Sequence, residues 1–334
     1  MTNALNPEEC VVNARNDTDT GFRSINRAYD RVFRAGRLSI GLVVPLETYD
    51  RGPVPDMHRH LARAKLAESL GFSALWLRDV PFLVPAFGDA GQLFDPWVYL
   101  GLLAGQTRHI ALGVASVVLP LRHPAHVAKA AATVDVLSDG RLLLGVASGD
   151  RPDEYPAMAL SHADRGASFR ESFDYIERMA ESWPAFRSGW GALSGQLDLL
   201  PKPTAGRLPL LVTGGSQQQP DWIAAHGDGW MLYPRPHALQ SRTIAGYRAR
   251  LQAAGGPDKP VMQPLYVDLL DDPDAPAAAI HLGLRTGVRS LVRHLHALQS
   301  LGINHVALNL RFNRADTETT LEALAANLLP HFPA

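Results

Sequence analysis

Eight short apolar runs, each followed by a segment of helical period, restrict the fold of this chain more than any other feature. The runs are rich in Leu, Val and Ile and cover residues 38–45, 73–78, 110–118, 141–147, 208–213, 228–232, 261–268 and 303–310. Such alternation is typical of parallel strands joined by helices. Eight repeats without a long linker predict a closed (β/α)8 TIM barrel, an α/β fold with insertion loops, in preference to an open doubly wound sheet.

The segments between the runs have apolar residues three or four positions apart, which predicts helices that bury one face on the sheet. Two of these helices are predicted to end at Gly71 and at Gly302, since glycine accepts the left-handed backbone of a helix end at little steric cost. Their apolar stripes are Met57, Leu61, Ala64, Ala67 and Leu70 in the first, and Val288, Leu291, Leu295 and Leu298 in the second.

Three segments depart from the regular repeat. Residues 1–36 are polar and irregular, with a possible short helix at 25–34, and they predict an arm in front of a single barrel domain at 37–334. A loop at 80–94 follows the second strand, and an irregular insertion around 183–207 follows the fourth. Long loops at the carboxyl ends of barrel strands are where barrel enzymes build their sites.

Composition excludes several classes of protein. The chain has 32 Lys plus Arg against 33 Asp plus Glu, so its net charge of -1 favours neither nucleic acid nor an anionic membrane as a partner. No apolar stretch is long enough to span a membrane, and the N-terminus lacks the apolar core of a signal peptide. The single Cys10 excludes a disulfide framework and predicts a cytoplasmic protein.

The common catalytic motifs are missing. The 13 histidines include no His-Glu-x-x-His pair, so we predict no metal site. The segment 145–149 (GVASG) has the wrong spacing for a hydrolase nucleophile, and the Rossmann and P-loop fingerprints are absent.

One segment has the character of an anion site. At 210–217 (LLVTGGSQ) a strand enters two glycines, Gly214 and Gly215, and is expected to continue into a helix. Glycines let the backbone approach an anion, and a helix N-terminus offers free N–H groups. The alternative is an ordinary tight turn with Ser216 capping the helix.

Two further segments remain open between a functional and a structural interpretation. After the fourth strand, the small residues around Ser148 leave room for a flat ligand, and Arg165 either pairs with its phosphate or is a solvated arginine at a helix start. After the third strand, His123 either faces the barrel mouth or caps the helix that begins near Pro124.

Taken in order, these segments resemble the bacterial luciferase-like flavin-dependent oxidoreductases. The resemblance runs from about residue 38 to the last helix, and several linked motifs carry it. They are 94–97 (FDPW), 107–113 (TRHIALG), 119–124 (LPLRHP), 128–130 (AKA), 133–142 (TVDVLSDGRL), 145–149 (GVASG), 154–155 (EY), 209–216 (PLLVTGGS) and 228–230 (DGW).

The resemblance implies a barrel that binds FMN, or in some relatives the deazaflavin F420, at the carboxyl ends of its strands. By position, Ala115 and Ser116 would lie under the isoalloxazine ring, where relatives often carry a non-proline cis peptide. The residues that would hold the ribityl phosphate are Ser148, Arg165, Gly214, Gly215, Ser216 and Gln217.

Two positions depart from the family pattern. Where luciferases carry a catalytic histidine after the second strand, this chain has Asp79, which is able to act as a base, bond the ring or pair with Arg78. Where luciferase has an arginine at the end of the fourth strand, this chain has Ser148. Light emission is therefore not expected.

We expect an FMN-dependent monooxygenase that oxidises a small organic substrate with oxygen, using reduced flavin from a separate reductase. Asp79 and His123 are its predicted acid–base residues. The alternatives are an F420-dependent hydride-transfer enzyme, a flavin-binding protein without turnover and, more remotely, a hydrolase. The family also implies a homodimer, and selectivity is expected from the loops at 80–94 and 183–207.

Overall fold

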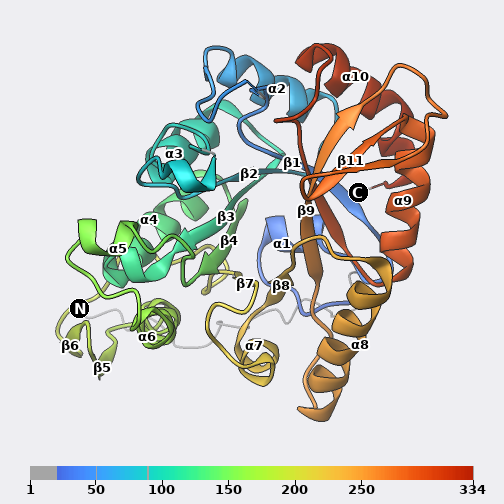
Figure 1. The fold of residues 1–334 in the computed structure, drawn as a ribbon. Coiled ribbons are helices and arrows are strands. Elements are labelled where there is room, and N and C mark those ends of the chain that lie inside the picture. The colour runs from blue at the N-terminus through green and yellow to red at the C-terminus, as the bar shows by residue number, and fades with distance from the viewer. Residues whose placement is uncertain (1–20, 50, 89, 334) are drawn as a thin grey trace, which may run out of the picture.

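The computed structural model describes residues 21–49, 51–88 and 90–333, which form a closed eight-stranded parallel barrel with helices between the strands (Figure 1). Pairing of β1 with both β2 and β12, and of β8 with β9, closes the ring. The predicted strands are all confirmed. They are β1 (Ser39–Val43), β2 (Ala74–Leu77), β3 (Ala111–Val118), β4 (Leu142–Ala147), β7 (Leu210–Thr213), β8 (Gly229–Met231), β9 (Val261–Leu269) and β12 (His305–Asn309).

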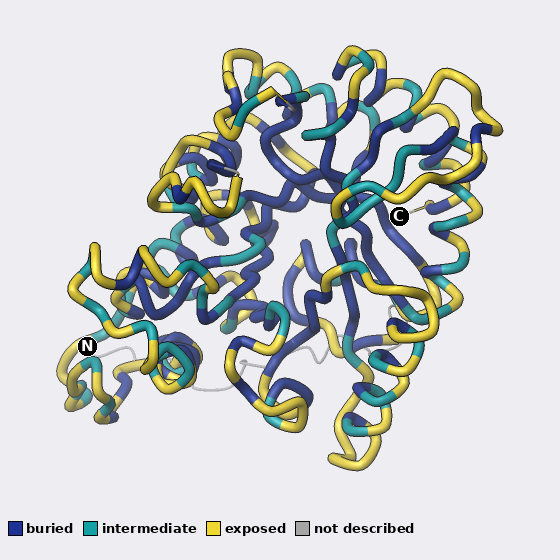
Figure 2. The backbone as a smooth tube through the Cα atoms, in the orientation of Figure 1, coloured by how far each residue is buried: buried dark blue, intermediate teal, exposed yellow. Residues whose placement is uncertain are grey.

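Helices surround the barrel, and all of them except the four-residue α5 bury apolar side chains on its outer wall (Figure 2). They are α2 (His60–Ser69), α3 (Pro96–Gln106), α4 (Pro124–Leu137), α5 (Glu154–Ala157), α6 (Arg165–Arg178), α7 (Pro220–His226), α8 (His237–Ala253), α9 (Val288–Ser300) and α10 (Thr317–Asn327), with short 3-10 turns η1 (Pro85–Phe87), η2 (Leu119–Leu121) and η3 (Leu329–His331). None of the helices in the described ranges is long and apolar enough to cross a membrane.

The short helix expected at 25–34 is present as α1 (Arg27–Val32), and it belongs to the barrel core. Its buried residues, with Phe33 behind them, pack on the inward-facing side chains of the strands. The Tyr29 hydroxyl donates to the Asp228 carbonyl over 2.7 Å, which ties the helix to the start of β8. This part of the predicted arm therefore closes the amino end of the barrel, while residues 1–20 lie outside the described part of the chain.

The barrel interior above α1 is filled by Trp76 and His305. The Trp76 indole N–H donates to Nε2 of His305 over 2.8 Å, so Nδ1 carries the proton and faces the Ser39 hydroxyl at 2.7 Å. A Cβ on Gly113 would lie 2.3 Å from the Trp76 ring, so only glycine fits beside it. Complete burial lowers the pKa of His305 to about 3 and keeps the ring neutral.

Two hairpins stand outside the barrel. The pair β5 (Ala185–Ser188) and β6 (Gly191–Ser194) lies in the insertion that the sequence predicts as irregular, so part of that segment has regular structure. The pair β10 (Ala278–Ile280) and β11 (Gly283–Thr286) was not predicted, and β11 adds in parallel to the upper half of β9. The β10–β11 hairpin follows the barrel strand β9, whereas the β5–β6 hairpin follows α6 and precedes β7. Both are additions in connections outside the barrel core.

Candidate functional site

At the carboxyl ends of the strands, β3 turns two consecutive side chains toward the barrel interior. Its pairing with β4 changes register between Val114 and Val117, so Ala115 packs on the inner core and Ser116 also reaches inward. The Ser116 hydroxyl is hydrogen-bonded to the Thr213 hydroxyl of β7, which also contacts the Met231 sulfur of β8 at 3.1 Å. The peptide between Ala115 and Ser116 is cis, as the resemblance implies.

The wall formed by β3, β4 and β7 carries small side chains near this end. Gly145 faces inward, and a Cβ there would lie 2.7 Å from the Met231 sulfur. Ala147 follows it on the same face of β4, by the alternation of strand side chains. Ala115, Ser116 and Thr213 complete the wall. This is the arrangement a flat ring system needs in order to lie against the strands.

The segment after β7 is a turn, and the expected helix begins later. Gly214, Ser216 and Gln217 all have positive φ, and α7 starts only at Pro220, behind Gln219. The alternative in which Ser216 caps a helix is wrong, because α7 begins later and the Ser216 hydroxyl donates back to the Thr213 carbonyl over 2.7 Å. Within the described chain, the backbone N–H groups of residues 215–217 donate to no acceptor. Consecutive free N–H groups in such a turn form an anion-binding nest.

The start of α6 packs directly on this turn. A Cβ on Gly166 would lie 2.8 Å from the Gln217 Cβ, and the Gln218 amide donates to the Gly166 carbonyl over 2.8 Å. Arg165, beside Gly166, donates to the His162 carbonyl over 2.7 Å, while its buried Nε has no partner among the described residues. The structure therefore brings Arg165 next to the turn from a segment about 50 residues earlier.

Ser148 lies at the end of β4 and is buried. Its carbonyl accepts a hydrogen bond from the Tyr155 hydroxyl, which fixes the start of the following loop. A Cβ on the adjacent Gly149, whose φ is +75°, would lie 2.9 Å from that hydroxyl. The close turn therefore requires glycine at this position.

Asp79 lies in a two-point ion pair with Arg122, and not with Arg78. Guanidinium nitrogens of Arg122 lie 2.7 and 2.9 Å from the two carboxylate oxygens, and the Val118 N–H also donates to Asp79. Burial lowers the pKa of Arg122, but hydrogen bonds and charge attraction from Asp79 and Asp95 outweigh it and raise the pKa above its usual range. The Asp79 carboxylate therefore holds Arg122 and the end of β3 in place.

His123 caps α4, which was the structural alternative. Its Nδ1 accepts from the Ala125 N–H over 3.2 Å. The ring contacts Trp190 of the insertion and Tyr175 of α6, with centroids 5.3 and 6.1 Å away. It is therefore grouped with the outer helices. No three His, Cys, Asp or Glu side chains of residues 21–49, 51–88 and 90–333 come together as a metal site, and the absence of a metal stays a prediction.

Two charged residues after β4 were not assigned a role from the sequence. Glu154 is only 2% exposed, and burial raises its pKa to about 7, with the nearby charges of Asp79 and Asp150 adding to the rise and Arg151 opposing it. Arg151 is its ion-pair partner at 3.8 Å, beyond hydrogen-bond distance. Charged residues between Gly149 and the next helix were visible in the sequence, but their burial was not.

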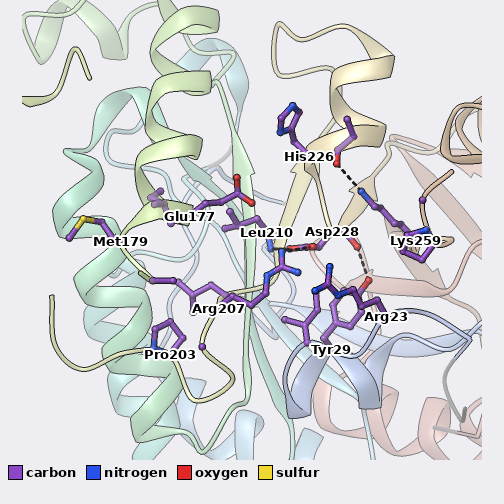
Figure 3. Close-up of a pocket in the computed structure, with 18 of the residues that line it drawn as sticks. Arg23, Tyr29, Glu177, Met179, Pro203, Arg207, Leu210, His226, Asp228 and Lys259 are labelled. Carbon is purple, nitrogen blue, oxygen red and sulfur yellow. Dashed lines mark hydrogen bonds and ion pairs between the residues drawn. The ribbon is translucent and has the colours of Figure 1, made fainter. Parts of the chain in front are cut away.

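A cavity of about 760 Å³ lies at the opposite, amino end of the barrel (Figure 3). Three of its charged residues already have partners there: Arg207 pairs with Asp228 at 2.7 Å, and Lys259 donates to the Ala224 carbonyl over 2.7 Å. Residues at that end of such barrels generally serve stability. We therefore place the candidate site at the carboxyl end, where the nest and the wall of small residues converge.

The described chain is thus a (β/α)8 barrel with free backbone N–H groups after β7 and small side chains at its mouth. The family model for luciferase-like monooxygenases matches residues 38–328, and the chain belongs to this family.

Relatives in the family use different cofactors. The chain is 35% identical over 214 residues to an uncharacterized protein of Mycobacterium tuberculosis, covering 58% of this chain and 72% of that one. It is 30% identical over 209 residues to the F420-dependent hydroxymycolic acid dehydrogenase of the same species, covering 59% and 54%. It is 31% identical over 137 residues to the oxygenase component of the flavin-dependent trigonelline monooxygenase of Acinetobacter baylyi, covering 39% and 34%.

The fold is also found in solved structures. The monooxygenase RslO1 of Streptomyces bottropensis superimposes with a TM-score of 0.74 at 20% identity, covering 88% of this chain and all of that one. At this identity the likeness concerns the fold alone.

Proposed function

We propose that the protein is an FMN-dependent monooxygenase, in which reduced FMN and molecular oxygen oxidise a small organic molecule. The observation that carries the proposal is the nest of free N–H groups at Gly215, Ser216 and Gln217, on which the start of α6 packs next to Arg165. A ribityl phosphate is an anion that such N–H groups and a guanidinium bind well. Ser148, on the neighbouring strand end, supplies a further hydroxyl to this group.

The chain's own contribution is binding, orientation and exclusion of water. Ala115, Ser116 and Ala147 would support one face of the ring system, while Thr213 keeps the Ser116 hydroxyl turned inward. When bound, reduced FMN would supply the reactivity toward oxygen, because no protein side chain has that reactivity. At the amino end of the barrel, α1 packs on the inward-facing side chains of the strands, so apolar side chains lie between that end and the proposed site.

Other features of the protein belong to the same proposal. A separate flavin reductase would supply reduced FMN, as the name "oxygenase component" of the A. baylyi relative suggests. We further propose a single barrel domain at 37–334, a homodimer and a cytoplasmic location. The acid–base roles of Asp79 and His123 remain predictions. In the structure, Asp79 pairs with Arg122 and His123 caps α4.

The second candidate is F420-dependent hydride transfer without oxygen. It is favoured by the similarity to the F420-dependent dehydrogenase of M. tuberculosis, which extends over 59% of this chain. F420 also carries a ribityl phosphate, so the nest serves either cofactor. A flavin-binding protein without turnover would use the same residues, and it would retain cofactor without consuming oxygen.

Replacing Arg165 with glutamine is expected to weaken FMN binding by about tenfold to a hundredfold, because a hydrogen bond to a charged group contributes about 1.5–3 kcal/mol. Gly166→Val should weaken binding as well, since its side chain would collide with Gln217 and displace the nest. Quenching of FMN fluorescence during titration with each variant measures the affinity.

The matched control is Arg178→Gln, at the other end of the same helix, where the guanidinium lies over Phe186. It should bind FMN like the unaltered protein. Equal FMN affinity in the Arg165→Gln and Arg178→Gln variants would show that phosphate does not occupy the nest.

A further inference from the structure

Arg151 is a partly buried cation with incomplete pairing. Its side chain is 13% exposed, yet the guanidinium donates no hydrogen bond to any residue that the structure describes, and its Nη1 is fully enclosed. The enclosed Oε1 of Glu154 also lacks a hydrogen-bond partner, at 3.8 Å from that nitrogen. Buried arginines are normally paired and hydrogen-bonded, so this arrangement leaves an acceptor missing.

Arg151 also extends across the mouth of the barrel. From the loop after β4, its guanidinium lies 5.0 Å from the ring centre of Phe87, in the loop after β2. Tyr233, after β8, is 45% exposed. Partial burial of its hydroxyl raises the pKa of Tyr233; the nearby charge of Asp150 adds to the rise and that of Arg151 opposes it. Arg151 is thus near residues from three different strand ends, above the wall of small residues.

The negative charges around Arg151 do not offset it fully. Asp79 is already paired with Arg122. Glu154 is the ion-pair partner of Arg151, but it lies 3.8 Å away, beyond hydrogen-bond distance. Near neutral pH the Glu154 carboxyl is also only partly ionised, since its pKa is about 7. The mouth therefore holds a positive group whose charge and hydrogen-bond donors remain available.

We propose that Arg151 binds a carboxylate of the organic substrate and that the exposed rings of Phe87 and Tyr233 contact its apolar body. A guanidinium recognises a carboxylate through two parallel hydrogen bonds, and aromatic faces at the rim suit a flat or apolar remainder. The inference rests on the proposed function. It assigns the substrate of that function to the class of organic carboxylates. Arg151 is in this role a specificity-determining residue.

Glu154 makes this binding pH-dependent. When its carboxyl is protonated, Arg151 is free for the substrate; when it ionises, it competes for the same guanidinium. The groups that face Glu154 are Arg151 and Asp150 from its own loop and Asp79 from the loop after β2. Carboxylate affinity should accordingly fall as the pH rises through about 7.

The test uses benzoate and its neutral analogue benzamide as probes, with dissociation constants measured by calorimetry on the protein with and without FMN. At pH 6 the unaltered protein should bind benzoate at least about tenfold more tightly than benzamide, as expected for a charge-assisted pair. Arg151→Gln should bind both equally. The control Arg235→Gln, an arginine on the loop after β8 that is bonded to Thr243, should keep the preference.

A second variant gives an independent result. Glu154→Gln should retain the preference for benzoate and bind it equally at pH 6 and pH 8, whereas the unaltered protein weakens at pH 8. Equal binding of both probes by the unaltered protein, or a preference that persists in Arg151→Gln, overturns the inference. FMN that binds without any benzoate preference contradicts the substrate class alone, while failure of FMN to bind contradicts the proposed function separately.

Discussion

Replacing Arg122 with methionine is expected to lower the free energy of unfolding by about 3–5 kcal/mol, because the Asp79 carboxylate would remain buried without its partner. The Asp79 side chain is 2% exposed and receives both guanidinium bonds of Arg122, so solvent cannot replace them. Urea unfolding followed by circular dichroism measures the loss.

The double variant Asp79→Asn with Arg122→Met removes both charges and should recover most of that loss. Arg27→Met is the matched control, since Arg27 pairs with Asp139 at 2.5 Å but in an exposed position. Its cost should stay within about 1 kcal/mol, as for surface ion pairs in general. A loss from Arg122→Met no larger than that of Arg27→Met would contradict the burial argument.

Acid should destabilise the fold through His305, by up to about 5 kcal/mol for a shift of this size. Burial depresses the pKa of this ring from 6.5 in the unfolded chain to about 3 in the folded one. The unfolded state therefore takes up a proton first as the pH falls below 6.5. The contribution of the neutral ring is complete above pH 6.5 and declines steadily as the pH falls toward 3.

The variant His305→Gln can still accept from Trp76 and donate to Ser39, but it does not titrate. Its free energy of unfolding should fall less steeply between pH 6.5 and 4 than that of the unaltered protein, by about 1.4 kcal/mol per pH unit. The exposed His58→Gln variant should keep the original slope. Equal slopes for His305→Gln and the unaltered protein would show that His305 is not held neutral by burial.

The barrel was predictable because its signals are local. Each strand is a short apolar run, and each helix shows its stripe within one segment. Gly71 and Gly302 both have a φ of +92° just past α2 and α9, as the left-handed helix ends require. The position of α1 inside the barrel was not predictable, since apolar spacing in a six-residue helix does not indicate which surface covers it.

The candidate site was predictable only in part, because its contacts join distant segments. The resemblance placed Arg165 and the turn at 214–217 in one phosphate site, and the packing of Gly166 on Gln217 supports their proximity. Helix α7 starts late, at Pro220, because proline is favoured in the first turn of a helix. The position of Pro220 was visible in the sequence and indicated that the turn before the helix is longer.

The partners of charged residues could not be read from the sequence. Asp79 is adjacent to Arg78 in the chain but pairs with Arg122. Successive residues of a strand point to opposite faces, so Asp79 points to the same outer face of the barrel as Leu77, two residues before it. The burial of Glu154 and the partial burial of Arg151 likewise arise from loops that meet only in the folded barrel.

The most direct test of the central claim is anaerobic titration of the protein with reduced FMN and, separately, with reduced F420, followed by mixing with oxygen. The account predicts that reduced FMN binds, that Arg165→Gln weakens this binding, and that the complex consumes oxygen. Binding of reduced F420 alone, with no oxygen consumed, would contradict the monooxygenase and favour hydride transfer. Binding of neither cofactor would contradict the assignment of the nest and the barrel mouth as a flavin site.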